Sequence, residues 1–131
     1  MIIGLGIDIV ENKRIANILE KYGNRFIKRC FSINEIIQSK KQLNQINFFS
    51  KRYAAKEACA KALGTGLAKG VFWKDIEIKN NNFGKPQIKL HNKALDRFRV
   101  ISSSLKTSIE ISITDEKNYS AANVIIFKNE K

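Results

Sequence analysis

The sequence predicts an α+β fold, in which a largely antiparallel β-sheet packs with helices that include one long central helix. Three observations support this prediction. Segments 2–10, 107–114 and 121–127 are apolar and typical of strands, segment 47–66 is helical over most of its length, and strands and helices are mixed rather than strictly alternating. The chain contains no linker and no internal repeat, so we expect residues 1–131 to form a single domain.

The first segment is predicted to be a strand with two unequal faces. One face, expected to lie on the core, carries four alternating apolar residues, Ile3, Leu5, Ile7 and Ile9. The other face carries Gly4, Gly6 and Asp8, an open shelf on which a ligand or a neighbouring chain could approach the backbone. A carboxylate in an apolar strand is unfavourable unless it is paired, solvated or bound to a metal. Asp8 is therefore a candidate site residue, although a hydrogen bond to a nearby loop would also explain it.

Two helical segments follow within residues 11–30, and Gly23 is expected to separate them. Ser32 and Glu35 then form a capping-box pattern that opens a third helix, with a helix end or loop over residues 38–45. The first two helical segments carry a set of basic residues on their outer surface, namely Arg14, Lys21, Arg25 and Lys28.

The central helix is predicted to be amphipathic. Its apolar stripe contains Phe48, Ala55, Ala58, Cys59, Ala62 and Leu63. Glu57 points away from this stripe, with Tyr53 and Lys61 one turn before and after it. An ordinary surface ion pair would explain Glu57 and Lys61, but the second isolated acid, Asp8, makes a two-carboxylate site the stronger interpretation.

Residues 64–66, Gly-Thr-Gly, are predicted to end this helix and turn the chain. The C-terminal end of a helix carries the wrong sign of dipole for an anion. A phosphate bound here would need loop N–H groups, lysine side chains or a metal ion. The pattern is therefore not a Walker-type loop.

The remaining chain is predicted to contain a hairpin, a helix and two closing strands. Strands over 72–78 and 86–90 flank a turn-rich segment, and Pro86 should begin an edge strand or lie in the loop before it. A helix over 92–101 precedes the strands at 107–114 and 121–127, which are joined by a turn.

Composition limits the function classes. The net charge of +12 suits nucleic acid, an anionic membrane surface, or an acidic protein partner with an anionic cofactor. The basic residues are scattered, and no zinc-finger or helix-turn-helix spacing is present, which argues against nucleic acid.

No apolar run reaches the roughly 20 residues of a membrane span, and no signal segment is evident, so we expect a cytoplasmic protein. Cys30, Cys59 and the single His91 form no zinc or disulfide pattern.

Three ordered motifs resemble the bacterial holo-acyl-carrier-protein synthases, which are small 4'-phosphopantetheinyl transferases. Residues 4–11, GLGIDIVE, followed by Arg14 and Ile15, resemble the opening of that family. Residues 51–66 resemble its central signature, and Gly84-Lys85-Pro86 with Tyr119-Ser120-Ala121-Ala122 fits its later part. The resemblance covers nearly the whole chain. One departure is Asp115, where many members have a histidine near the nucleotide.

The resemblance implies transfer of phosphopantetheine from coenzyme A to a serine of apo acyl carrier protein, with release of adenosine 3',5'-bisphosphate, in support of fatty acid biosynthesis. It implies that Asp8 and Glu57 hold Mg²⁺, which favours oxygen ligands and substrate phosphates, and that Lys61 stabilises charge on the phosphate. Glu57 and another carboxylate both stay open as the general base. Further coenzyme A contacts are implied for Arg52, Gly64, Thr65, Gly66, Lys85 and Pro86.

Acyl carrier proteins are acidic, so the basic set Arg14, Lys21, Arg25 and Lys28 is a candidate docking surface, or else an ordinary solvated face. The resemblance also implies a homotrimer with active sites between subunits. Two alternatives stay open: a small basic nucleic-acid-binding protein without catalysis, and a non-catalytic module that binds coenzyme A or the carrier protein. Neither nucleic acid nor a membrane is expected as a partner.

Overall fold

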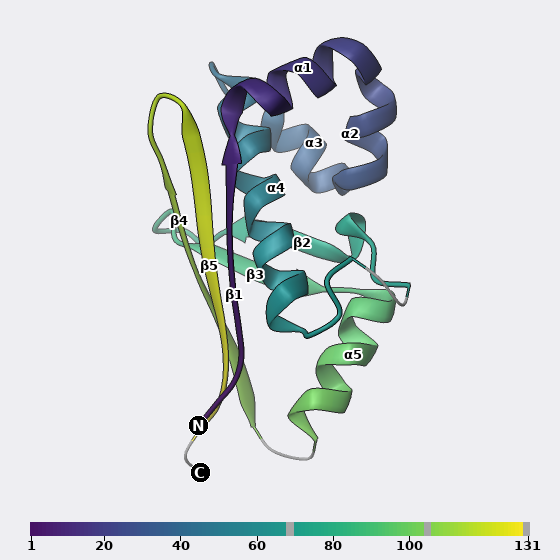
Figure 1. Cartoon of the computed structure of the whole chain (residues 1–131), viewed down its shortest axis with the longest axis vertical. Helices are drawn as coiled ribbons and strands as arrows, with labels where there is room; N and C mark the ends of the chain where they lie inside the picture. The colour runs from purple at the N-terminus through teal and green to yellow at the C-terminus, as the bar shows by residue number, and fades with distance from the viewer. Residues whose placement is uncertain (68–69, 104–105, 130–131) are drawn as a thin grey trace.

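The computed structural model describes residues 1–67, 70–103 and 106–129 (Figure 1). Helices and strands are mixed along the chain, which confirms the predicted α+β class. In chain order the elements are β1 (Ile2–Glu11), α1 (Asn12–Tyr22), α2 (Asn24–Cys30), α3 (Ile33–Ser39), α4 (Gln45–Ala62), the 3₁₀ turn η1 (Trp73–Asp75), β2 (Ile76–Asn80), β3 (Pro86–Leu90), α5 (Asn92–Ser102), β4 (Thr107–Asp115) and β5 (Tyr119–Lys128). Within the described residues, no helix is both long and apolar enough to span a membrane.

Two antiparallel sheets form the β part of the molecule. The larger has the strand order β1-β5-β4, and the smaller is the β2-β3 hairpin. Figure 1 shows α4 running along the larger sheet, with α1, α2 and α3 gathered at one end of the molecule and α5 toward the other. The first and last strands of the chain therefore lie side by side, and they bring Asp8 opposite Ala122.

The prediction for the faces of β1 is wrong. Leu5, Ile7 and Ile9 are 62%, 67% and 65% exposed, and the glycine face lies against α4 instead. A Cβ atom at Gly4 would overlap the carbonyl oxygen of Ala62, and one at Gly6 would overlap that of Ala58. The shelf of Gly4 and Gly6 is therefore filled by α4 of the same chain. Only glycine, which has no Cβ atom, allows the backbones of β1 and α4 to come so close.

The predicted amphipathic pattern of α4 is also wrong. The six residues of the apolar stripe are buried, but so is most of the rest of the helix, including Arg52 and Lys56. The larger sheet covers one side of α4, while α1, α3 and β2 contact it elsewhere. A helix enclosed in this way needs apolar or paired side chains around most of its circumference. Among residues 50–62, only Lys51, Glu57 and Lys61 are not buried.

The helices before α4 begin and end as predicted. Gly23 ends α1 with a positive φ of 52°, and its N–H donates to the Leu19 carbonyl over 2.8 Å. Ser32 and Glu35 form the predicted capping box of α3. The Glu35 side chain is also 1% exposed, which the capping pattern alone does not explain.

The predicted strand over 72–78 is wrong in its first half. Trp73–Asp75 form a 3₁₀ turn, and the strand begins at Ile76. Asp75 stabilises this turn because its carboxylate accepts from the Phe72 N–H at 3.4 Å and from the Asn92 side chain at 3.0 Å. The hairpin itself is confirmed, and Pro86 begins its second strand opposite Asn80.

Candidate active site

Asp8 leaves β1 on the side that faces α4. Lys61 of α4 donates to Asp8 Oδ1 over 3.1 Å and to the Ile7 carbonyl oxygen over 3.0 Å. The sequence placed Lys61 beside Glu57, but the structure pairs it with the other acid. The side chains of Lys61 and Asp8 are 51% and 18% exposed, so water screens this ion pair and the lysine can exchange partners readily.

Glu57 is half-buried and is contacted by two aromatic residues. The indole Nε1–H of Trp73 donates to Glu57 Oε1 over 3.3 Å. Tyr53, one turn earlier on α4, stacks with Trp73 at 6.3 Å between ring centroids. Burial, then the charge of Glu57 and a hydrogen bond with it, raise the pKa of Tyr53 to about 12. Sequence reasoning missed Trp73, because no spacing connects it with Glu57 and the contact depends on the 3₁₀ turn.

The packing of β1 on α4 sets the level of Asp8 along this helix. Gly4 meets α4 at Ala62, and Gly6 meets it at Ala58. Two residues of β1 therefore span about one turn of α4, and β1 runs toward the N-terminus of the helix. This agrees with the rise of roughly 6.8 Å for two strand residues and about 5.4 Å for one helical turn. The next residue on the same face is Asp8, which this register places near the level of Ala54, three residues before Glu57 on α4.

The two carboxylates fit a hard divalent cation that a ligand phosphate completes. Among the residues that the structure describes, no three His, Cys, Asp or Glu side chains are grouped to bind a metal by themselves. Mg²⁺ is usually held by one or two carboxylates together with substrate phosphates and water. Asp8 and Glu57 match that donor set, and Lys61, which pairs with Asp8, lies one turn after Glu57 on α4.

The backbone of the turn after α4 caps the C-terminal end of this helix. The N–H groups of Gly64 and Gly66 donate back to the carbonyl oxygens of Lys61 and Ala60, each over 3.0 Å. Arg97 of α5 donates to a third carbonyl, that of Leu63, over 2.8 Å. The backbone donors of Gly64 and Gly66 are thus directed at the helix, and the Thr65 hydroxyl donates to the Gly66 carbonyl at 2.7 Å.

Arg52 lies beside a separate hollow. Its guanidinium stacks over the Phe48 ring at 3.8 Å, and its Nε is buried without a hydrogen-bond partner in the described part of the chain. Burial lowers the pKa of Arg52, and the charge of Glu35 opposes that shift. The hollow has a volume of about 510 Å³ and is lined by polar and basic residues that include Lys51, Arg52 and Lys79. Its chemistry suits an anion.

Lys85 and Pro86 lie apart from Asp8. Lys85 Nζ pairs with Glu110 Oε2 of β4 over 2.8 Å, and β4 is the opposite edge of the larger sheet from β1. A single chain therefore does not gather all of the predicted coenzyme A contacts in one place.

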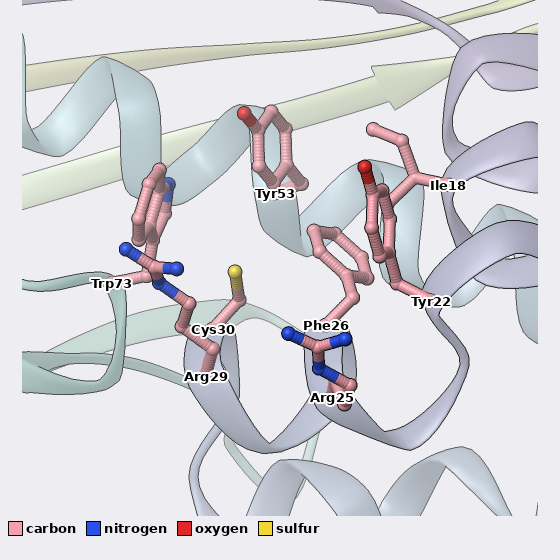
Figure 2. Close-up of a pocket in the computed structure, with 8 residues that line it drawn as sticks. All are labelled: Ile18, Tyr22, Arg25, Phe26, Arg29, Cys30, Tyr53 and Trp73. Atoms are coloured by element: carbon pink, nitrogen blue, oxygen red, sulfur yellow. The ribbon is translucent and has the colours of Figure 1, made fainter.

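A cavity of about 440 Å³ lies between α1, α2 and α4 (Figure 2). Its lining is largely aromatic and aliphatic, with two guanidinium groups, and consists of Ile18, Tyr22, Arg25, Phe26, Arg29, Cys30, Tyr53 and Trp73. Burial raises the pKa of Cys30 to about 11, so this thiol stays protonated at neutral pH. Because Tyr53 and Trp73 contact Glu57 as well, the cavity adjoins Glu57.

Of the four basic residues predicted to dock a partner, Arg25 lines this cavity. Arg14, Lys21 and Lys28 are exposed on α1 and α2. The structure therefore places the predicted docking residues on the same two helices that form one side of the cavity.

Comparison with known proteins identifies the family. The family model described as the 4'-phosphopantetheinyl transferase superfamily matches residues 4–123. The holo-[acyl-carrier-protein] synthase of Ehrlichia chaffeensis is 46% identical over 130 residues, which cover 97% of this chain and 98% of the relative. The chain thus belongs to the 4'-phosphopantetheinyl transferase superfamily, and it is an enzyme of the phosphopantetheinyl transferase class.

Solved structures of related synthases share the fold. The holo-[acyl-carrier-protein] synthase from Neisseria meningitidis has a TM-score of 0.86 and 34% identity, with 98% of this chain and 100% of that chain covered. The synthase from Bacillus anthracis str. Ames, in complex with CoA (3',5'-ADP), has a TM-score of 0.80 and 33% identity, with coverage of 98% and 99%. The resemblance seen in the sequence is therefore confirmed at the level of the family and the fold.

Proposed function

We propose that this enzyme transfers 4'-phosphopantetheine from coenzyme A to a serine hydroxyl of apo acyl carrier protein and releases adenosine 3',5'-bisphosphate. The observation that carries the proposal is the packing of β1 on α4, which turns Asp8 toward this helix and pairs it with Lys61, one turn after Glu57. The related Bacillus anthracis synthase, solved with CoA (3',5'-ADP), supports coenzyme A as the donor.

In this proposal Asp8 and Glu57 hold Mg²⁺, which when bound neutralises the pyrophosphate and polarises its oxygens during the displacement. Lys61 leaves Asp8 and donates to a phosphate oxygen, where negative charge develops as the bond to the leaving nucleotide breaks. Its 51% exposure and its helical position one turn from Glu57 support that exchange. Arg52, with its unpaired Nε, and Thr65 are further candidates for contacts with the nucleotide.

The carrier protein is proposed to dock on α1 and α2. Arg14, Lys21, Arg25 and Lys28 would attract its acidic surface, and the cavity in Figure 2 would accept apolar side chains beside Glu57. Charge would then govern the encounter, while the apolar cavity would fix the register of the target serine.

A homotrimer with active sites between subunits is proposed for two reasons. Leu5, Ile7 and Ile9 form an exposed apolar strip on the outer face of the larger sheet, and such strips mark protein interfaces. Lys85 and Pro86 lie at the sheet edge opposite Asp8, so a neighbouring copy can bring them to the coenzyme A site. Analytical ultracentrifugation tests this, and Ile7→Glu should produce monomers if the strip is the interface.

The proposed reaction makes the active carrier used in fatty acid biosynthesis, and we propose that it takes place in the cytoplasm. Its test is incubation of the purified chain with coenzyme A, Mg²⁺ and apo acyl carrier protein, followed by mass spectrometry of the carrier. Phosphopantetheine should appear on the carrier and should be absent when a chelator is added. If a carrier protein that is able to accept phosphopantetheine stayed unmodified, the transferase proposal would be contradicted, and a module that only binds coenzyme A or the carrier would be favoured.

A further inference from the structure

Lys56 is a buried charge next to the proposed site. Its side chain is 0% exposed, and its Nζ makes three hydrogen bonds: to Glu35 Oε1 at 2.7 Å, to the Trp73 carbonyl at 2.9 Å and to the Ile76 carbonyl at 2.6 Å. An ammonium group has three donors, so all of them are used. Burial lowers the pKa of Lys56, and the adjacent Glu35 carboxylate opposes this shift.

Glu35 fixes this lysine from the other side. Its Oε1 also accepts from the Ser32 backbone N–H at 2.9 Å, and its Oε2 accepts from the Ile78 N–H at 3.2 Å. The carboxylate therefore links α3, α4 and β2 in one network. A network in which every member is satisfied holds its parts rigidly, since any movement would leave a buried charge unpaired.

Trp73 is attached to α4 at both ends of the residue. Its backbone carbonyl is bonded to Lys56, its ring stacks on Tyr53, and its Nε1–H is bonded to Glu57 Oε1. Lys56 and Glu57 are consecutive residues, so the helix and the 3₁₀ turn form a closed frame around the indole. The frame holds the Nε1–H donor of Trp73 next to the Glu57 carboxylate.

We propose that Trp73, held in place by the Lys56–Glu35 pair, is a positioning residue for Glu57. By donating to Oε1 it orients the carboxylate for the divalent cation and the coenzyme A phosphates. This inference rests on the proposed function and deepens it. Outer-shell partners of metal ligands typically contribute tenfold to a hundredfold to metal affinity. The Trp73 bond is long at 3.3 Å, so we expect the lower end of that range.

The test uses Trp73→Phe, which keeps an aromatic ring in the turn and removes the N–H donor. Mn²⁺ serves as the probe and is titrated in the presence of coenzyme A by electron paramagnetic resonance. The dissociation constant for Mn²⁺ should rise about tenfold, the Mg²⁺ concentration for half-maximal transfer should rise in parallel, and the KM for the carrier protein should change less than twofold. Phe72→Leu is the matched control, because Phe72 is the exposed aromatic neighbour in the same segment, and it should match the wild type.

A readout without turnover comes from Trp73 itself, which is the only tryptophan of the chain. Its emission should change as Mg²⁺ and coenzyme A bind, and Glu57→Gln should abolish that change. The double variant Lys56→Met/Glu35→Gln removes the buried charges together, so that it avoids an unpaired ion. It should stay folded while acrylamide quenches Trp73 more strongly and Mn²⁺ binds more weakly.

The outcomes separate this inference from the proposed function. A wild-type enzyme that modifies the carrier, together with a Trp73→Phe variant that binds Mn²⁺ within twofold of it, overturns the positioning role alone. A wild-type chain that neither modifies the carrier nor binds Mn²⁺ overturns both. Equal quenching of Trp73 in the wild type and in the double variant would contradict the role of the Lys56–Glu35 pair.

Discussion

Two lysine–carboxylate pairs occur on α4, five residues apart, and they differ in almost every physical respect. Lys56–Glu35 is 2.7 Å long, and its side chains are 0% and 1% exposed. Lys61–Asp8 is 3.1 Å long, and its side chains are 51% and 18% exposed. In the buried pair each group has several hydrogen-bond partners, so neither can leave the other without leaving a buried charge that has no counter-ion. The exposed pair can open with little loss of free energy, which is the property that a phosphate-binding lysine needs.

The largest expected effect is on the acids of the proposed site. Asp8→Asn and Glu57→Gln each remove a proposed metal ligand and should reduce transfer about 1,000-fold. Both residues are partly solvated, so the free energy of unfolding should change by less than about 1 kcal/mol. Transfer assays and urea unfolding measure the two quantities. Full activity in either variant would remove that residue from the metal site.

The two lysines should separate stability from catalysis. Lys56→Ala leaves the Glu35 carboxylate buried and unpaired, so we expect a loss of about 3–5 kcal/mol in the free energy of unfolding. Lys61→Ala should unfold at nearly the wild-type urea concentration while transfer falls about 100-fold. The comparison fails if the two variants lose stability equally.

Gly6→Ala tests the contact that places Asp8. The new Cβ would overlap the Ala58 carbonyl oxygen, so β1 must move away from α4. We expect a loss of about 1–3 kcal/mol in the free energy of unfolding, together with reduced transfer because Asp8 moves with the strand. Gly23→Ala is the control, since its positive φ of 52° makes alanine unfavourable there while the new Cβ meets no atom closer than 3.7 Å and β1 does not move. Equal losses of transfer in the two variants would contradict the role of the Gly6 contact.

The smallest effect is expected at the docking surface. Arg14→Glu should raise the KM for the carrier protein about tenfold at low salt and change the KM for coenzyme A less than twofold, with the difference shrinking as salt is added. Steady-state kinetics at two salt concentrations measure this. Equal changes in both KM values would show that Arg14 does not recognise the carrier.

The local patterns of the sequence were enough to predict most elements. The Gly23 helix end, the Ser32–Glu35 capping box and the β2-β3 hairpin depend on neighbouring residues, and all three are confirmed. The choice of buried face in β1 was wrong because it depends on a tertiary contact: the apolar residues alternate correctly, but the glycines are the side that the helix approaches.

The sequence was enough to propose the residues of the candidate site but not the contacts between them. Asp8, Glu57 and Lys61 were proposed as site residues from the sequence, and their roles stay predictions. The pairing of Lys61 with Asp8 could not be predicted because it requires the packing of β1 on α4. The burial of Lys56 was not predicted, because a lysine beside a glutamate on a helix is usually solvated. Only the position of α3, which carries Glu35, and the 3₁₀ turn at Trp73 show that it is buried.

The glycine contacts of β1 have a consequence for the mechanical tolerance of the site. Because strand and helix meet backbone to backbone at Gly4 and Gly6, no side chain sets the spacing between them. We therefore expect substitutions elsewhere in the core to change the stability of the protein more than the approach of β1 to α4 at these two glycines. The spacing at these positions is set by van der Waals contact between the two backbones.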